Sequence, residues 1–150
     1  MEPSDLIAPF TETNILCYTS LSFLAPAYYA YQKNIPFLSA LLCLTSFTSY
    51  SYWSYPLING FCRKLDLIFS KISFGICFGY GMIYVQEPQC YVGYGIFLSM
   101  ICNYWLANSM YYLKQKTWSN YHAVFHLCVM AEQMLIVYCL EPNETTLSHV

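Results

Sequence analysis

Two histidines four residues apart are the residues of this chain whose spacing best suits chemistry. His122 and His126 lie in the stretch 118–132, which opens the last long apolar segment. On a helix, residues i and i+4 share a face with Cβ atoms about 5–6 Å apart, so such imidazoles can bind one zinc ion at about 2.0–2.1 Å. In the alternative interpretation, both rings are polar helix-end residues that face lipid headgroups or hydrogen-bond to neighbours. The metal interpretation needs further polar groups at the same depth.

The composition indicates a membrane protein. The chain of 150 residues is 57% hydrophobic, 19% aromatic and 9% charged, whereas soluble domains carry about 25% charged residues. Its apolar residues come in runs of about twenty, which is the length that crosses a membrane. We therefore expect an all-α, polytopic bundle of transmembrane helices. A net charge of −2 offers no basic patch, so we expect membrane lipids as partners and no nucleic acid.

The apolar runs predict five spans between an acidic leader and a short tail. The leader is 1–13, the spans are about 14–32, 36–55, 66–85, 90–113 and 119–140, and the tail is 141–150. Pro26 should kink the first span, because proline removes a backbone hydrogen bond. Four of the basic residues fall on the side of the N-terminus, namely Arg63, Lys64, Lys114 and Lys116. The positive-inside rule then places the N-terminus in the cytoplasm, whereas the sequence does not distinguish the plasma membrane from an endomembrane.

The eight cysteines do not predict a disulfide framework or a thiolate zinc site. No CxxC pair is present. Five of the cysteines lie inside apolar segments, where cysteine acts as a small packing residue: Cys17, Cys43, Cys77, Cys102 and Cys128. The third span instead carries a polar stripe, because Asp66, Ser70, Ser73 and Cys77 recur at helical spacing. Such a stripe should face other helices, since polar groups facing lipid are costly.

Three separate polar clusters should meet at the cytoplasmic end of the bundle. They are the hydroxyl-rich end of the second span (46–55), Asp66 at the start of the third, and the histidine pair at the start of the last. A zinc ion there would lower the pKa of bound water from near 16 to about 7 and so supply a hydroxide. Asp66 could orient that water or accept its proton, and the Ser46 hydroxyl could donate to the developing oxyanion.

At these positions the chain resembles the superfamily of progestin and adiponectin receptors, haemolysin III and alkaline ceramidases. His122-Ala-Val-Phe-His126 is similar to its last-helix motif, and Lys64-Leu65-Asp66 to its third-helix motif. Ser46-Phe-Thr-Ser-Tyr50 falls where the family has Ser-xxx-His, so Tyr50 stands in place of a histidine. The resemblance implies a zinc ion held by histidines and, for several members, hydrolysis of lipid amides. It also implies a metal-ligand set of His122, His126 and Tyr50.

The chain departs from that superfamily in two ways. Its members have seven helices and three zinc-binding histidines, whereas this chain lacks two helices and has His149 at the other membrane face. Asp66, Tyr50 or Cys62 would have to complete the ligand set. These departures are also what a shortened relative without catalytic activity would show.

Three functions remain open at this stage. The first is a zinc-dependent intramembrane hydrolase of lipid amide or ester bonds, similar to a ceramidase. The second is a non-catalytic scaffold of the same superfamily, with a receptor-like or membrane-remodelling role. A small ion channel is the third and has less support, because the polar residues gather at one end. Five helices leave a lateral opening that a second copy could fill, so a homo-oligomer is also expected.

Overall fold

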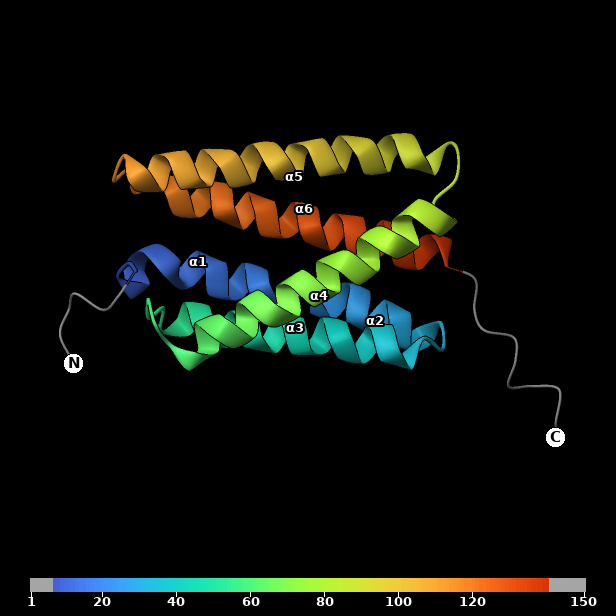
Figure 1. The fold of residues 1–150 in the computed structure, drawn as a ribbon, viewed down its shortest axis with the longest axis horizontal. Coiled ribbons are helices and arrows are strands. Elements are labelled where there is room, and N and C mark those ends of the chain that lie inside the picture. The colour runs from blue at the N-terminus through green and yellow to red at the C-terminus, as the bar shows by residue number, and fades with distance from the viewer. Residues whose placement is uncertain (1–6, 141–150) are drawn as a thin grey trace, which may run out of the picture.

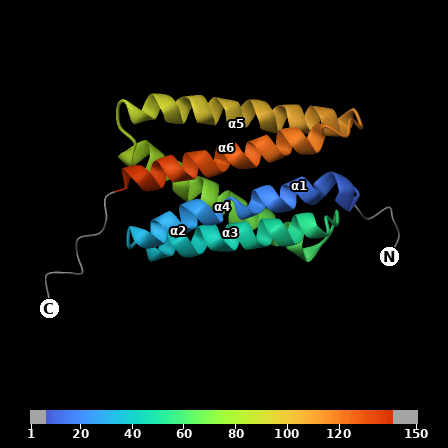
Figure 2. The same ribbon diagram turned by 180° about the vertical axis from the view of Figure 1, so that it is seen from behind.

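The computed structural model of the protein describes residues 7–140, and within that range it is a helical bundle without strands (Figures 1 and 2). The helices are α1 (Phe10–Leu21), α2 (Leu24–Gln32), α3 (Pro36–Ser54), α4 (Phe61–Tyr84), α5 (Gln89–Tyr112) and α6 (Trp118–Cys139). The all-α fold class is thereby confirmed. The tail 141–150 and the first six residues of the leader lie outside the described residues. The rest of the leader overlaps the first turn of α1.

The first predicted span is two helices, and the break between them follows from Pro26. Proline lacks an N–H and crowds the carbonyl four residues earlier, which here belongs to Ser22, the residue that ends α1. The Ala25 amide still bonds to the Ser22 carbonyl at 3.0 Å, and the Ser22 hydroxyl donates to the Thr19 carbonyl at 2.6 Å. The predicted kink is therefore present one turn before the proline that causes it.

The helices form two layers joined by a diagonal helix. α5 packs along α6, while α1 and α2 pack along α3, and α4 runs diagonally from α3 to α6 (Figures 1 and 2). The start of α4 lies against α3. Its second half lies against α6, where the Gln133 amide donates to the Ser73 hydroxyl at 3.4 Å. The first half of α4 lies against α3 and away from α6. Space therefore opens between α4 and α6 at the end of the bundle where both helices begin.

Each end of the bundle has its own apolar cluster. One cluster is built on Leu38, Leu42 and Val137, which are fully buried, with the small Ala30 allowing α2 to approach α3. At this end Lys33 donates to the carbonyls of Tyr138 and Leu140, both at 2.7 Å. This contact is favourable because a cation there satisfies the last carbonyls of α6. The other cluster joins aromatic residues of α3 and α6 with α1: Leu16, Cys17, Tyr52, Trp53, Trp118 and Ala123.

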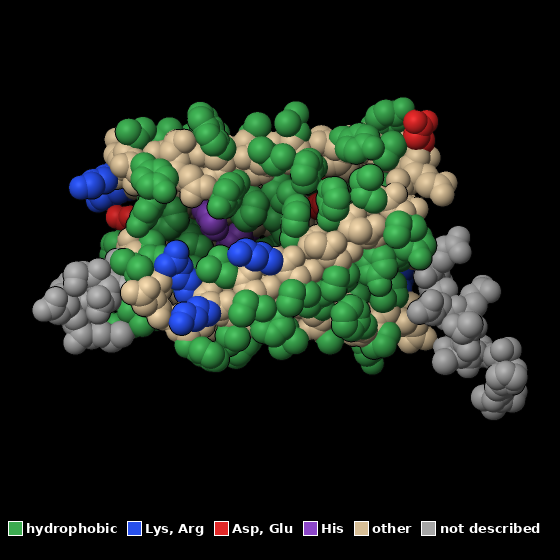
Figure 3. All heavy atoms as spheres, in the orientation of Figure 1, with side chains coloured by type: hydrophobic (Ala, Val, Ile, Leu, Met, Phe, Trp, Pro, Cys, Tyr) green, Lys and Arg blue, Asp and Glu red, His purple; other side chains and the backbone are tan. Residues whose placement is uncertain are grey.

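The polar stripe of α4 faces the other helices, as predicted. The buried residues of α4 are Asp66, Ser73 and Cys77. Its outer face is apolar and exposed, with Ile68, Ile72 and Phe78 among the exposed side chains; Figure 3 shows hydrophobic side chains along this helix. A helix that is polar inside and apolar outside suits a lipid environment.

Three of the described helices, α4, α5 and α6, are long and apolar enough to cross a membrane. The first predicted span is divided into helices of 12 and 9 residues, each too short to cross alone. The third predicted span begins earlier than expected, at Phe61 instead of Asp66. Gly60 precedes it because a Cβ at that position would lie 2.9 Å from the Leu57 Cβ. Arg63 and Lys64 are therefore part of the helix.

Candidate functional site

A cavity of about 540 Å³ lies at the end of the bundle where α4 and α6 begin. Residues of α3, α4, α5 and α6 line it, with Phe23 reaching it from the break between α1 and α2. Figure 3 shows this hollow between α4 and the α5–α6 pair, with a histidine at its floor and basic side chains along the α4 edge. Asp66, His122 and His126 all line the cavity. The sequence predicted that these three residues would meet.

The two imidazole rings lie close enough to share an ion. Their centroids are 4.9 Å apart and the planes are inclined at 70°. Two rings bound to one tetrahedral ion at about 2.0–2.1 Å would have centroids about 5 Å apart. The Nδ1 atom of His126 lies 3.1 Å from the Thr19 hydroxyl, so a metal ion would have to bind the other nitrogen, Nε2. Such a hydrogen bond on the second nitrogen is typical of metal-binding histidines, because it fixes the ring.

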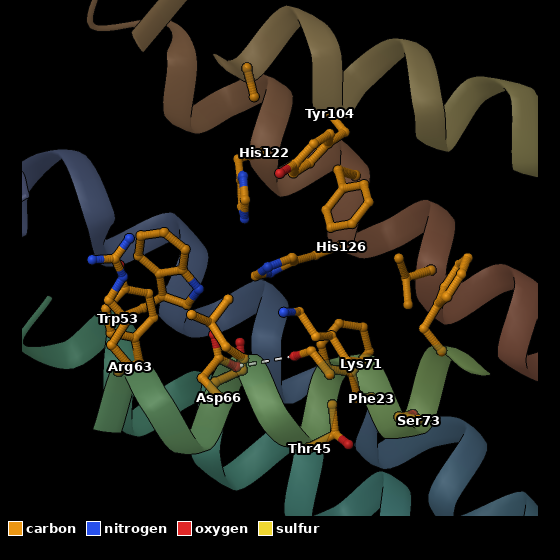
Figure 4. A pocket seen from close by; sticks show the side chains of 18 of the residues that line it. Phe23, Thr45, Trp53, Arg63, Asp66, Lys71, Ser73, Tyr104, His122 and His126 are labelled. Carbon is orange, nitrogen blue, oxygen red and sulfur yellow. Dashed lines mark hydrogen bonds between the residues drawn. The ribbon is translucent and has the colours of Figure 1, made fainter. Parts of the chain in front are cut away.

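Asp66 occupies the α4 wall, and its side chain extends toward His126 in Figure 4. The Ser70 hydroxyl donates to its Oδ1 atom at 3.3 Å, and the Ser49 hydroxyl also bonds to the carboxylate. Ser49 in turn accepts a hydrogen bond from the Ser20 hydroxyl at 3.0 Å. A buried carboxylate needs such donors. This hydroxyl chain holds Asp66 in place without a basic partner.

Aromatic side chains enclose the histidines. The Trp53 ring lies 5.1 Å from His122 and 6.4 Å from His126, and the Phe23 ring lies 5.5 Å from His126. Phe125, between the two histidines in the sequence, lies 5.4 Å from His122. These rings give the cavity an apolar wall that excludes water and suits an acyl chain.

Ser46 and Tyr50, the two site residues predicted from α3, do not line the cavity. Ser46 is buried between α1 and α3, where its hydroxyl donates to the Ser20 carbonyl at 2.9 Å. Tyr50 is 39% exposed on the outer surface of the bundle. The structure thus corrects both predictions, since neither the proposed oxyanion donor nor the proposed metal ligand reaches the histidines. Cys62, the other candidate ligand, is also exposed and outside the cavity.

Ser49 and Trp53 occupy the cavity wall in their place. They repeat the spacing of Ser46 and Tyr50 three residues later, close to one helical turn, and both line the cavity. Sequence reasoning missed Trp53, although its spacing from Ser49 and its place near the end of the second span were available signals. An indole N–H only donates hydrogen bonds, so Trp53 cannot replace a metal-binding histidine.

A metal ion in this cavity would have two imidazoles as its protein ligands. Within residues 7–140, no three His, Cys, Asp or Glu side chains lie close enough to hold one ion. Catalytic zinc sites usually have three protein ligands and one open position. The histidine pair thus fits one ion, while the Asp66 carboxylate faces the pair from the other wall of the cavity.

No protein-family model matches the chain, and neither the curated proteins nor the solved structures contain a match to it.

Proposed function

We propose that the protein is a multi-pass membrane hydrolase that cleaves lipid amide or ester bonds with zinc held by His122 and His126. The observation that carries this proposal is that Asp66 and both histidines line one apolar-walled cavity. They come from helices that are far apart in the sequence and are long and apolar enough to cross a membrane. The motifs around these residues support a shortened member of the superfamily named above.

Each residue of the cavity has a separate role in the proposed hydrolysis. When zinc is bound, the site gains a hydroxide nucleophile at neutral pH, because the metal lowers the pKa of bound water to about 7. Asp66, oriented by Ser70, accepts a proton from water on the α4 wall. Trp53 and Phe23 keep bulk water from the histidines, which strengthens electrostatic interactions inside the cavity.

The metal content of purified protein tests this proposal. We expect about one zinc per chain in detergent, and loss of the metal when both histidines are replaced in His122→Ala/His126→Ala. Asn120→Ala is the matched control, because Asn120 lies on the same helix end but is exposed. Wild-type protein without metal, together with unchanged stability of the double variant, would refute the proposal.

A non-catalytic, receptor-like lipid-binding protein is the second candidate. It is favoured by Trp53, which faces the histidines with a group that cannot bind metal. The two candidates differ in the effect of Asp66→Asn. A hydrolase should lose turnover while the folded protein is retained, whereas a binding protein should keep its activity.

We also propose the topology that accompanies this function. α1 and α2 together, α3, α4, α5 and α6 would make five crossings, with the N-terminus in the cytoplasm. Four basic residues support this orientation: Arg63, Lys64, Lys114 and Lys116. A homo-oligomer stays a prediction that the molecular mass in detergent would test.

A further inference from the structure

Three hydrogen-bond donors, from Trp53, Lys71 and Arg63, line the cavity. The Trp53 indole N–H is buried and has no partner, and the side chain is only 6% exposed. Lys71 lines the same cavity, and its side chain extends from α4 toward His126 in Figure 4. Arg63 is the third donor; its Nη1 atom bonds to the Ile58 carbonyl, which leaves its other N–H groups available.

The charges that line the cavity leave a positive excess. Arg63 and Lys71 are cations, and Asp66 is the carboxylate among the lining residues. Asp66 is bonded to Ser49 and Ser70, so it does not neutralise either cation through a direct contact. A buried N–H without an acceptor is costly. An oxygen-rich anion in the cavity would supply the acceptor that the indole lacks and would offset the excess positive charge.

The remainder of the cavity suits one hydrocarbon chain. The volume of the whole cavity, about 540 Å³, lies within the range of about 300–1,000 Å³ that is typical of small-molecule sites. Phe74 on α4 and Tyr104 on α5 form part of its walls, on the side where these two helices are not packed closely together. Further along the bundle, the rings of Phe78 and Phe97 meet at 6.2 Å. The cavity is therefore bordered by aromatic side chains where α4 and α5 face each other.

We propose that the cavity binds a single-chain lipid with a phosphate monoester headgroup, taken laterally from the bilayer between α4 and α5. The phosphate oxygens accept hydrogen bonds from the Trp53 indole, the Lys71 ammonium and the Arg63 guanidinium, while the acyl chain lies against Phe23 and Phe125. Phosphate is favoured over carboxylate because its additional oxygens and charge match two cations and a neutral donor. This inference depends on the proposed function only in treating the cavity as a lipid site.

Binding to the full-length protein in nanodiscs of phosphatidylcholine tests the inference. Calorimetric titration would compare oleoyl lysophosphatidate, oleate, lysophosphatidylcholine and inorganic phosphate. We expect one lysophosphatidate per chain, with a Kd at least tenfold lower than that of either other lipid and without competition from millimolar phosphate. Equal binding of oleate or lysophosphatidylcholine would overturn the phosphate assignment. Competition by inorganic phosphate would show an anion site that does not require a lipid.

Single substitutions identify the donors. Lys71→Met and Trp53→Phe should each weaken lysophosphatidate binding at least tenfold. Lys64→Met is the matched control, because Lys64 is an exposed cation of the same helix that does not line the cavity, and it should bind like wild type. Equal losses in Lys64→Met and Lys71→Met would show general attraction to anionic lipid and overturn the proposal. If Trp53→Phe fails to fold, Arg63→Met replaces it in the comparison.

The variant without the histidine pair separates this inference from the proposed hydrolysis. His122→Ala/His126→Ala keeps all three donors, so it should still bind lysophosphatidate within a few-fold of wild type. Binding by a protein that holds no zinc would refute the proposed hydrolase but support the lipid site. Zinc in the wild type without selective lysophosphatidate binding would support the hydrolase and refute the lipid site.

Discussion

Thr19→Val tests the role of the histidine pair through a residue that touches neither zinc nor lipid in the proposed site. The Thr19 hydroxyl lies 3.1 Å from His126 Nδ1, and it also bonds to the carbonyls of Ile15 and Leu16 within its own helix. Valine keeps the branched shape and removes the hydroxyl. If His126 binds zinc through Nε2, the substitution releases the second nitrogen and loosens the ring.

The expected loss in zinc affinity is about 10–100-fold, which is typical when a hydrogen bond to a metal-binding histidine is removed. This change corresponds to about 1.4–2.7 kcal/mol, since each tenfold step is about 1.36 kcal/mol. The assay is competition for zinc between the purified protein and a chelator of known affinity. The helix of Thr19 should be little affected, because its hydroxyl satisfies carbonyls that already accept backbone hydrogen bonds.

Thr48→Val is the matched control for this experiment. Its hydroxyl bonds to the carbonyls of Leu44 and Thr45 in the same helical pattern, but it contacts no histidine. Zinc affinity should therefore be unchanged in Thr48→Val. Equal losses in both variants would show that general helix destabilisation is responsible, and wild-type affinity in Thr19→Val would refute the assignment of Nε2 as the ligand atom.

Three further predictions address stability and turnover. Lys33→Met removes two hydrogen bonds to the end of α6 and should lower the free energy of unfolding by about 1–3 kcal/mol, whereas exposed Lys116→Met should have little effect in the same denaturation assay. Leu42 is fully buried, so Leu42→Ala should cost about 2–5 kcal/mol; a cost no larger than that of exposed Leu44→Ala would contradict the packing described for α3. Asp66→Asn should reduce lipid hydrolysis about 10²–10⁴-fold without loss of folded protein in detergent; wild-type turnover would remove Asp66 from the mechanism.

The sequence predicted correctly those parts of the fold that depend on whether a side chain is polar or apolar. Long apolar runs located α4, α5 and α6, and the helical spacing from Asp66 to Cys77 identified the inner face of α4. The meeting of Asp66 with the histidine pair followed from placing each residue at a helix end on the same side of the bundle. A depth in the membrane can be estimated from distance to the polar breaks in the sequence.

The face of α3 could not be predicted in the same way. Hydroxyl and aromatic residues occur all round its second half, so the sequence does not show which side is buried. Ser46 and Ser49 are both buried and both bond to Ser20 of α1, but only Ser49 also lines the cavity. Tertiary packing determines which side of α3 is buried: it places Trp53 beside His122 and leaves Tyr50 on the outer surface.

The central claim is that the two imidazoles hold one ion at the cavity wall, and zinc K-edge X-ray absorption of the purified wild-type protein tests it most directly. We predict scattering from two imidazole rings with nitrogen at about 2.0–2.1 Å, with oxygen ligands in the remaining positions. A spectrum dominated by sulfur, or one without imidazole scattering, would contradict the account.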